Sequence, residues 1–188
     1  MSKGLTTGET LPDFELPDEN GELHRLSELQ GDDAMALMLG RGEHCPRERQ
    51  HQREMLKVYE WCSVAFTQMV TVLPNELHDV YKLKISTGAH WTFLADVDLE
   101  LQKALDIREY TDEVHAANVP HTLILSPTLK VEYAYVGYWF WGRPNPYRLW
   151  DDLEKLYRKL KPDFDPTTAA AKAAWKKQVA AGKVPAHH

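Results

Sequence analysis

Hydrophobic residues recur along the chain with two different periods, and these periods separate strands from helices. Runs of apolar or alternating residues predict strands at 14–17, 22–26, 34–39, 69–73, 90–94, 121–125 and 130–136. Apolar residues at helical spacing predict helices at about 47–64, 74–83, 96–105 and 146–160. The helix between the buried runs 34–39 and 69–73 requires parallel strands, whereas 121–125 and 130–136 form an antiparallel hairpin. The order predicts an α/β fold whose central mixed sheet is flanked by helices, with an N-terminal β-hairpin.

The C-terminal part of the chain changes character after Pro162, which ends the last strongly amphipathic helix. We therefore predict one domain over residues 1–162 and a C-terminal helical extension over 163–188. The extension is rich in Ala and Lys and carries Trp175. It is either a helix docked on the domain or a partly ordered tail.

Composition narrows the classes of function. The 188 residues carry a net charge of −6, which argues against a nucleic acid or an anionic membrane as the main partner. The start of the chain has no apolar run of signal-peptide length, and no stretch approaches the length of a transmembrane helix. Two cysteines cannot build a disulfide framework, so the predicted compartment is a reducing, cytoplasmic one.

Cys45 lies where a buried strand gives way to a long helix, and this position favours a reactive thiol. A helix N-terminus presents unpaired N–H groups and partial positive charge. Arg41, Arg47 and His44 add positive charge nearby, and Pro46 suits the first helical turn. Positive surroundings lower the pKa of a cysteine, and the thiolate is the nucleophilic form. Cys45 is therefore the candidate redox residue.

The site is predicted to use one sulfur. The position three residues after Cys45, where a dithiol motif has its second cysteine, is Glu48. Cys62 follows 17 residues after Cys45 in the same predicted helix, which places the two about 25 Å apart. A disulfide needs Cα atoms within about 7 Å, so a resolving thiol has to come from another molecule.

Several segments resemble the thioredoxin-like peroxiredoxin superfamily, specifically redoxins related to alkyl hydroperoxide reductase and thiol-specific antioxidant proteins. The segments are 11–21 (LPDFELPDENG), 26–31 (LSELQG), 41–46 (RGEHCP), 93–96 (FLAD) and 119–122 (VPHT). The third is similar to the family stretch Arg-Gly-x-Trp-Cys-Pro, and the last corresponds to the place where thioredoxin folds carry a cis-proline. The resemblance covers roughly residues 11–160 and implies a thioredoxin-like fold.

The resemblance also implies a reaction and a set of site residues. A single cysteine would reduce a hydroperoxide, or alternatively a disulfide substrate, and an external thiol of the thioredoxin or glutathione type would regenerate it without a cofactor. The candidate catalytic residues are Cys45, Arg41, His44 and Pro120, and the candidate substrate-binding or thiolate-stabilising residues are Gly42, Pro46, Glu48 and His121. The peptide bond before Pro120 is either cis, as in thioredoxin folds, or an ordinary trans bond.

Three departures from the family pattern keep other functions open. Gly42 stands where peroxiredoxins carry a peroxide-binding Thr or Ser, Glu48 replaces a second cysteine, and His44 replaces an aromatic residue. The alternatives to a peroxidase are a binding or sensing module on a redoxin scaffold and a monothiol disulfide reductase.

Two further features have competing interpretations. His44, Cys45, His51 and His121 offer the nitrogen and sulfur ligands that zinc prefers, but no Cys-x-x-Cys or His-x-x-x-His spacing is present, so we expect no dedicated metal site. The aromatic run 133–141 either packs under the terminal segment, for example against Trp175, or forms the surface of a homodimer.

Overall fold

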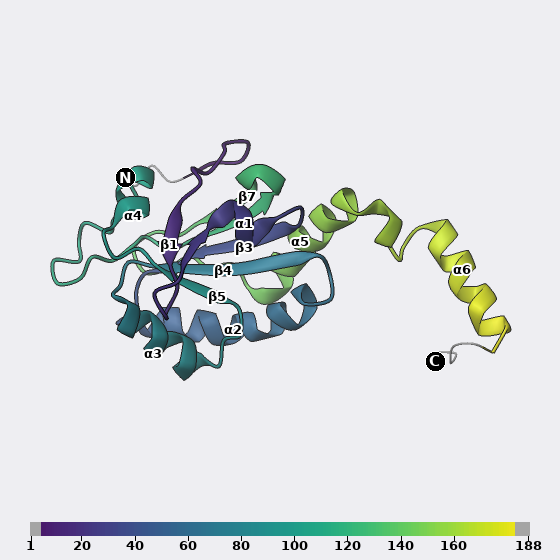
Figure 1. Cartoon of the computed structure of the whole chain (residues 1–188), viewed down its shortest axis with the longest axis horizontal. Coiled ribbons are helices and arrows are strands. Elements are labelled where there is room, and N and C mark those ends of the chain that lie inside the picture. The colour runs from purple at the N-terminus through teal and green to yellow at the C-terminus, as the bar shows by residue number, and fades with distance from the viewer. Residues whose placement is uncertain (1–4, 183–188) are drawn as a thin grey trace.

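The computed structural model of the chain describes residues 5–182 (Figure 1). Its elements are β1 (Glu15–Pro17), β2 (Leu23–Arg25), α1 (Leu26–Gln30), β3 (Ala34–Leu39), α2 (Pro46–Cys62), β4 (Thr67–Leu73), α3 (Leu77–Thr87), β5 (Thr92–Ala95), α4 (Glu100–Leu105), β6 (His121–Ser126), the 3₁₀ turn η1 (Pro127–Leu129), β7 (Lys130–Val136), α5 (Pro146–Leu160), the 3₁₀ turn η2 (Pro162–Phe164) and α6 (Ala169–Ala180). The predicted order of strands and helices is confirmed.

A five-stranded mixed sheet forms the centre of the domain, in the order β5-β4-β3-β6-β7. Strands β3, β4 and β5 run parallel, since helices connect them, whereas β6 pairs antiparallel with both β3 and β7. The short strands β1 and β2 form a separate antiparallel hairpin. This topology confirms the predicted thioredoxin-like α/β fold.

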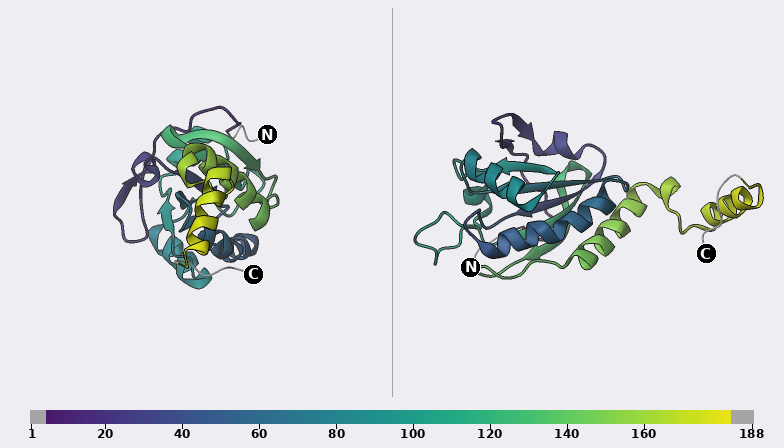
Figure 2. Two further views of the ribbon diagram at one scale, coloured as in Figure 1. Left: turned by 90° about the vertical axis from the view of Figure 1, so that its right-hand side faces the viewer. Right: turned by 90° about the horizontal axis from the view of Figure 1, so that it is seen from below.

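Side chains of β3 alternate between two hydrophobic cores, one on each face of the sheet. Ala36 and Met38 face the core that α2, α3 and α5 cover. Leu37 and Leu39 face the other core, which is covered by the N-terminal hairpin, α1 and α4. Figure 2 shows these two helical layers on opposite sides of the sheet. Because β3 is buried on both faces, the loop after it begins from a fixed position, and that loop carries Cys45.

Helices α3 and α4 both begin later than predicted. In each case a polar side chain in the predicted first turn accepts hydrogen bonds from backbone N–H groups. The side-chain Oδ1 of Asn75 accepts a hydrogen bond from the backbone N–H of Glu43 at 3.0 Å, so Asn75 serves the loop instead of starting α3. The Asp96 carboxylate accepts hydrogen bonds from the N–H groups of Leu101 and Gln102 at 3.2 and 2.9 Å. Asp96 therefore caps α4 from a distance.

The C-terminal extension contains the predicted helix α6, but this helix is not docked on the domain. Figures 1 and 2 show α6 projecting away from the sheet, and none of its residues is buried. Trp175 is 47 % exposed, whereas Tyr133 and Tyr135 pack against the core beside α5. The division at residue 162 stays a prediction. The chain start and the last part of the extension, 1–4 and 183–188, lie outside the described residues.

No helix within residues 5–182 combines the length and the apolar character that crossing a membrane would need.

Leu153 of α5 tests how strongly this helix stabilises the domain. Its side chain is fully buried in the core against α2 and the sheet. Leu153→Ala should lower the free energy of unfolding by about 2–5 kcal/mol, measured by urea denaturation, because it removes buried methyl groups and leaves a cavity. The neighbouring Glu154→Ala breaks only a half-exposed pair with Arg158 and should cost less than about 0.5 kcal/mol. Equal losses for the two variants would contradict this packing.

Candidate active site

Cys45 occupies the N-cap position of α2. Its backbone is extended, with φ −85° and ψ 117°, and Pro46 follows as the first helical residue. The backbone N–H of Cys45 donates to the carbonyl of Gly42 at 3.2 Å, which closes a tight turn before the helix. Pro46 has no N–H, and in the described chain the N–H of Arg47 has no hydrogen-bond partner. The helix N-terminus therefore offers one unpaired backbone donor next to a thiol that is 5 % exposed.

Glu48, in the first turn of α2, is a buried carboxylate that joins three parts of the chain. It accepts hydrogen bonds from the backbone N–H of Arg41 at 2.9 Å, from the Gln52 side chain at 2.8 Å and from the Arg143 guanidinium at 2.6 Å. Burial raises the pKa of Glu48, but Arg143, His51 and these hydrogen bonds outweigh it, so the pKa lies below its usual value. Glu48, the acidic residue expected near Cys45, thus forms an ion pair with Arg143.

The network continues from Glu48 into the core. Gln52 accepts from the Thr71 hydroxyl at 3.2 Å, and that hydroxyl accepts from the indole N–H of Trp91 at 2.9 Å. All four groups are buried, so their polar atoms depend on one another for hydrogen bonds. The start of α2 is therefore fixed to β4 and to the residue before β5.

Arg41 is buried beside this network, and its guanidinium is ion-paired with two carboxylates. It pairs with Glu109 at 3.3 Å and with Asp112 at 2.8 Å, both in the segment 106–118 between α4 and β6. In the described chain no hydrogen bond or ion pair joins Arg41 to Cys45, and the role of Arg41 at the thiol stays a prediction. Arg41 instead attaches the loop before Cys45 to the segment 106–118.

Two asparagines complete the attachment of this loop. Asn118 donates its side-chain amide to the Gly40 carbonyl at 3.0 Å and its backbone N–H to the Arg41 carbonyl at 3.1 Å. Asn75 holds the N–H of Glu43, as described above. The loop between β3 and α2 is therefore bound along its length by segments on either side of it.

Gly42 has a left-handed backbone with φ +139°, and a neighbouring side chain fills the space beside it. A Cβ atom at this position would lie 2.8 Å from Cε1 and 2.9 Å from Nδ1 of His44. The threonine that peroxiredoxins carry here is thus excluded both by the backbone and by His44.

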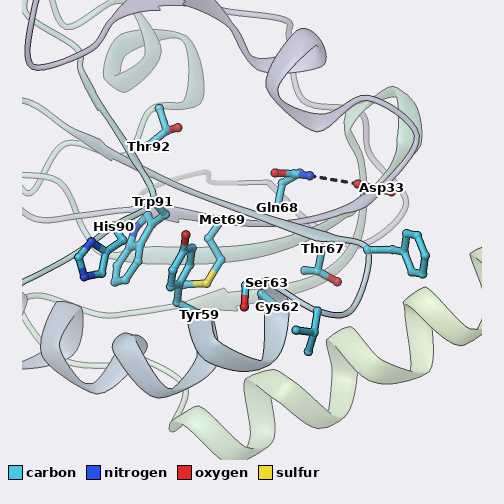
Figure 3. A pocket seen from close by; sticks show the side chains of 12 residues that line it. Asp33, Tyr59, Cys62, Ser63, Thr67, Gln68, Met69, His90, Trp91 and Thr92 are labelled. Atoms are coloured by element: carbon cyan, nitrogen blue, oxygen red, sulfur yellow. Dashed lines mark hydrogen bonds between the residues drawn. The ribbon is translucent and has the colours of Figure 1, made fainter.

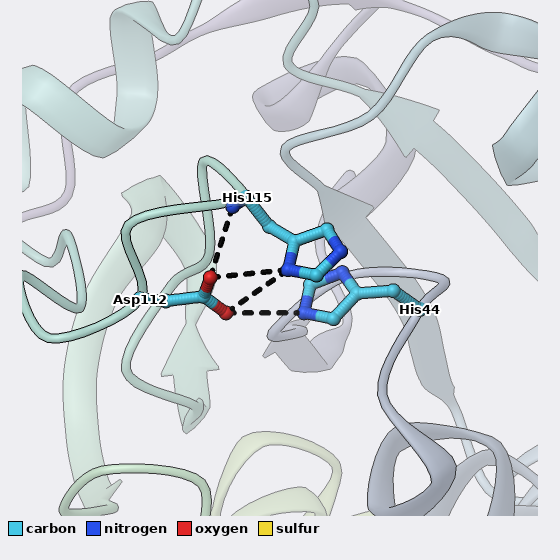
Figure 4. A group of neighbouring side chains, drawn as sticks. All are labelled: His44, Asp112 and His115. Atoms are coloured by element: carbon cyan, nitrogen blue, oxygen red, sulfur yellow. Dashed lines mark hydrogen bonds and ion pairs between the residues drawn. The ribbon is translucent and has the colours of Figure 1, made fainter.

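His44 turns toward the segment 106–118, where its ring stacks on that of His115 with centroids 3.7 Å apart and planes inclined by 1° (Figure 4). Its Nε2 lies 3.6 Å from the Asp112 carboxylate. Burial, followed by the neighbouring His115, lowers the pKa of His44. His44 is therefore neutral near pH 7, and the positive charge predicted for it beside Cys45 is absent at that pH.

His121 begins β6, in register with Leu39 at the end of β3, and Pro120 directly precedes the strand. All peptide bonds in residues 5–182 are trans, so the bond before Pro120 is an ordinary trans bond and not the cis bond of thioredoxin folds. The Nδ1 of His121 lies 2.7 Å from the Val119 carbonyl, which can only accept, so Nδ1 carries the proton. Burial lowers the pKa of His121. The Nε2 of the neutral ring, which has no hydrogen-bond partner within residues 5–182, can then only accept.

Cys62 is at the other end of α2, as predicted, and is unsuited to catalysis. Burial raises the pKa of its thiol to about 12. It lines a surface cavity of about 630 Å³ together with Tyr59, Met69 and Trp91 (Figure 3). Both cysteines are free, which agrees with their separation along the helix.

Several residues of the site were missed by the sequence analysis. They are Glu109, Asp112, His115 and Asn118, from one irregular segment, and Arg143, from the loop between β7 and α5. The signal that could have found the first group is the concentration of acidic and histidine residues in a stretch that precedes Pro120 and lacks periodicity.

Glu48→Ala tests the buried network. The change leaves Arg143 and the Arg41 N–H without their acceptor, and breaking a buried ion pair costs about 3–5 kcal/mol. We expect a loss of that size in urea denaturation. Glu54→Ala, one and a half turns along the exposed face of α2, should change stability by less than about 0.5 kcal/mol. A loss below about 1 kcal/mol for Glu48→Ala would refute the central position of this carboxylate.

His51 should make folding sensitive to acid. Burial lowers its pKa to about 4 from the ordinary 6.5, with Glu48 and Arg143 as its charged neighbours. Between these two values the unfolded chain binds a proton that the folded chain does not. His51 therefore makes stability fall with decreasing pH, by up to about 1.4 kcal/mol per pH unit.

The measurement is urea denaturation from pH 7.5 to 4. His51→Phe should flatten the pH dependence, because a phenyl ring binds no proton, although His44 and His121 still contribute. The same substitution at the exposed His78 should leave the slope of the parent. An unchanged slope in His51→Phe would show that His51 titrates normally.

Comparison with known proteins agrees with this architecture. A chain from Vibrio vulnificus, solved as reduced Prx3 in complex with hydrogen peroxide, superposes with a TM-score of 0.71 at 19% identity, covering 80% of this chain and 99% of that one. A yeast mitochondrial 1-Cys peroxiredoxin gives 0.69 at 11% identity, covering 85% and 78%. A putative thiol:disulfide interchange protein DsbE from Chlorobium tepidum gives 0.58 at 22% identity, covering 84% and 96%. These likenesses establish the fold.

A search of curated proteins finds no match to the chain. The model of the AhpC/TSA family, however, matches residues 7–134, which is more than half of the sequence and includes Cys45 and the segments that enclose it. The chain belongs to the AhpC/TSA family.

Proposed function

We propose that the protein is a thiol peroxidase that reduces hydroperoxides through Cys45 alone and is regenerated by an external thiol. The observation that carries the proposal is the placement of the two cysteines. Cys45 occupies the N-cap position of α2 beside an unpaired N–H, whereas Cys62 ends the same helix with a thiol pKa raised to about 12. One cysteine is thus positioned for redox chemistry and the other is not.

In the proposed reaction, the Cys45 thiolate attacks one oxygen of the peroxide. A sulfur–oxygen bond forms, the O–O bond breaks, and the leaving oxygen takes a proton as water or an alcohol, which leaves a sulfenic acid. An external thiol then attacks that sulfur, releases water and forms a mixed disulfide. A second external thiol restores Cys45 and leaves as the disulfide.

The charges around Cys45 decide which groups assist this reaction. Arg41 and Arg143 are both ion-paired to carboxylates, and His44 is neutral near pH 7. The stabilisation of the thiolate and of the peroxide oxygens then falls mainly to the positive end of α2, including the Arg47 N–H. The Arg47 guanidinium itself lies 4.2 Å above the Trp141 ring.

External regeneration has support beyond the distance between the cysteines. In the yeast mitochondrial 1-Cys peroxiredoxin, the thiol is resolved via glutathione and thioredoxin systems. A reductant of that type is what a single-cysteine site in this chain would need. The cytoplasm stays the predicted compartment, because its thiols keep unpaired cysteines reduced. A homodimer through the aromatic run 133–141 also stays a prediction.

A second candidate function rests on Gly42. His44 fills the space that a peroxide-binding hydroxyl would occupy, so the site lacks the hydroxyl of the family pattern. A monothiol disulfide reductase would not need that hydroxyl, because its substrate contains no peroxide oxygen. A sensing module on the same scaffold would need only that Cys45 be oxidised.

Hydrogen peroxide consumption with a thiol reductant distinguishes these functions, with a chelator present to suppress metal-catalysed decomposition. The parent and Cys62→Ala should consume peroxide at similar rates, and Cys45→Ser should lose the activity. A sulfenic-acid trap should label the parent at Cys45 only. Equal consumption by Cys45→Ser and the parent would reject the peroxidase. Trapping of Cys45 without turnover would favour a sensor, and turnover of a disulfide without peroxide would favour the reductase.

A further inference from the structure

The side chains of His44, Asp112 and His115 form a compact group beside the loop that carries Cys45 (Figure 4). Asp112 and His115 come from the segment 106–118, and His44 comes from the loop itself. In the described part of the chain, only one other group of three has comparable ligand atoms, namely Asp18, Glu22 and His24 in the N-terminal hairpin.

The three ligand atoms have the spacing of a metal site. The His115 Nδ1 lies 3.2 Å, and the His44 Nε2 3.6 Å, from the same oxygen, Oδ2 of Asp112. Ligand atoms in a tetrahedral site with bonds of about 2.0–2.1 Å are about 3.3 Å apart. The two rings are stacked with planes inclined by 1°, so binding one ion would also require the rings to turn until both nitrogen lone pairs point at it.

Two observations point to a ligand that protein groups do not supply. The Nε2 of His44 is buried and has no hydrogen-bond partner in residues 5–182, although it faces a carboxylate and a second imidazole. A cavity of about 120 Å³ adjoins the group and is lined by Gly42, His44, Asn75 and His115. This cavity would give a bound ion an open position for water, as in three-ligand metal sites.

The charges nearby suit a cation. The Oδ1 of Asp112 accepts hydrogen bonds from the backbone N–H groups of Val114 and His115 at 3.1 and 2.9 Å, which leaves its Oδ2 toward the two imidazole rings. Arg41 donates to the same carboxylate at 2.8 Å, and Glu109 offsets the charge of Arg41. The surroundings thus keep a net negative charge, and Arg41 orients the carboxylate in the manner of an outer-shell residue.

We propose that His44, Asp112 and His115 form a binding site for a divalent transition metal ion such as Zn²⁺. Two imidazoles, one carboxylate and an open position are a ligand set that zinc accepts. The ion would join the loop before Cys45 to the segment 106–118, since each supplies ligands. This proposal does not depend on the peroxidase activity.

Calorimetric titration of the reduced, full-length protein with Zn²⁺ tests the proposal. The parent should bind one ion with an affinity that His115→Ala weakens at least about 10–100-fold, the loss typical even of outer-shell changes. His115 is suitable because its side chain is 44% exposed, so the variant should fold. His24→Ala removes a ligand from the other group and should bind as the parent does. Thermal denaturation should show stabilisation by Zn²⁺ in the parent and in His24→Ala, but not in His115→Ala.

Co²⁺ provides a readout that does not need a variant. Bound to imidazole and carboxylate, it should give visible d–d bands without the ultraviolet charge-transfer band of a cobalt–thiolate bond. A thiolate band, or loss of Zn²⁺ binding in Cys45→Ser with no change in His115→Ala, would assign the metal to the cysteine and overturn the proposal. Loss in His24→Ala alone, or equal affinity in all variants, would overturn it as well.

Discussion

The buried negative charge of Glu48 is the constraint on which the rest of the site depends. A carboxylate without water must be paired, and here three donors come from different parts of the chain: the loop after β3, α2 itself and the segment after β7. These donors fix where the loop leaves the sheet and where α2 begins. Cys45 stands between those two points, so its position follows from satisfying the charge of a residue three places later.

The same principle explains how the neighbouring segments are attached. Arg41 binds the segment 106–118 through Glu109 and Asp112, while Arg143 binds the segment after β7 to α2 through Glu48. Both arginines are paired with carboxylates, so neither leaves an unpaired positive charge beside Cys45. Such a thiol takes its electrostatic environment mostly from the backbone of α2. This differs from the sequence-based expectation, in which side-chain cations surrounded the thiol.

The fold was predictable because it rests on periodicity that each segment carries locally. The buried run 34–39 and the amphipathic helix after it indicate a parallel pair, and Pro162 marks the end of a helix. The position of Cys45 at the start of α2 follows from the same pattern. The partners of its neighbours do not, since Glu109, Asp112, His115 and Asn118 lie in an irregular segment about 70 residues away. No local rule relates them to Arg41 or His44, and only the folded arrangement of β3 beside β6 brings them together.

The position of the His44 ring beside Gly42 has a consequence for attempts to redesign the site. A threonine at position 42 would collide with the His44 ring, and a cysteine at position 48 would remove the acceptor of Arg143 and of the Arg41 N–H. Restoring either residue of the family pattern alone would therefore damage the site. The two substitutions are epistatic with His44 and Arg143, so a return to the common motif would require concerted replacements.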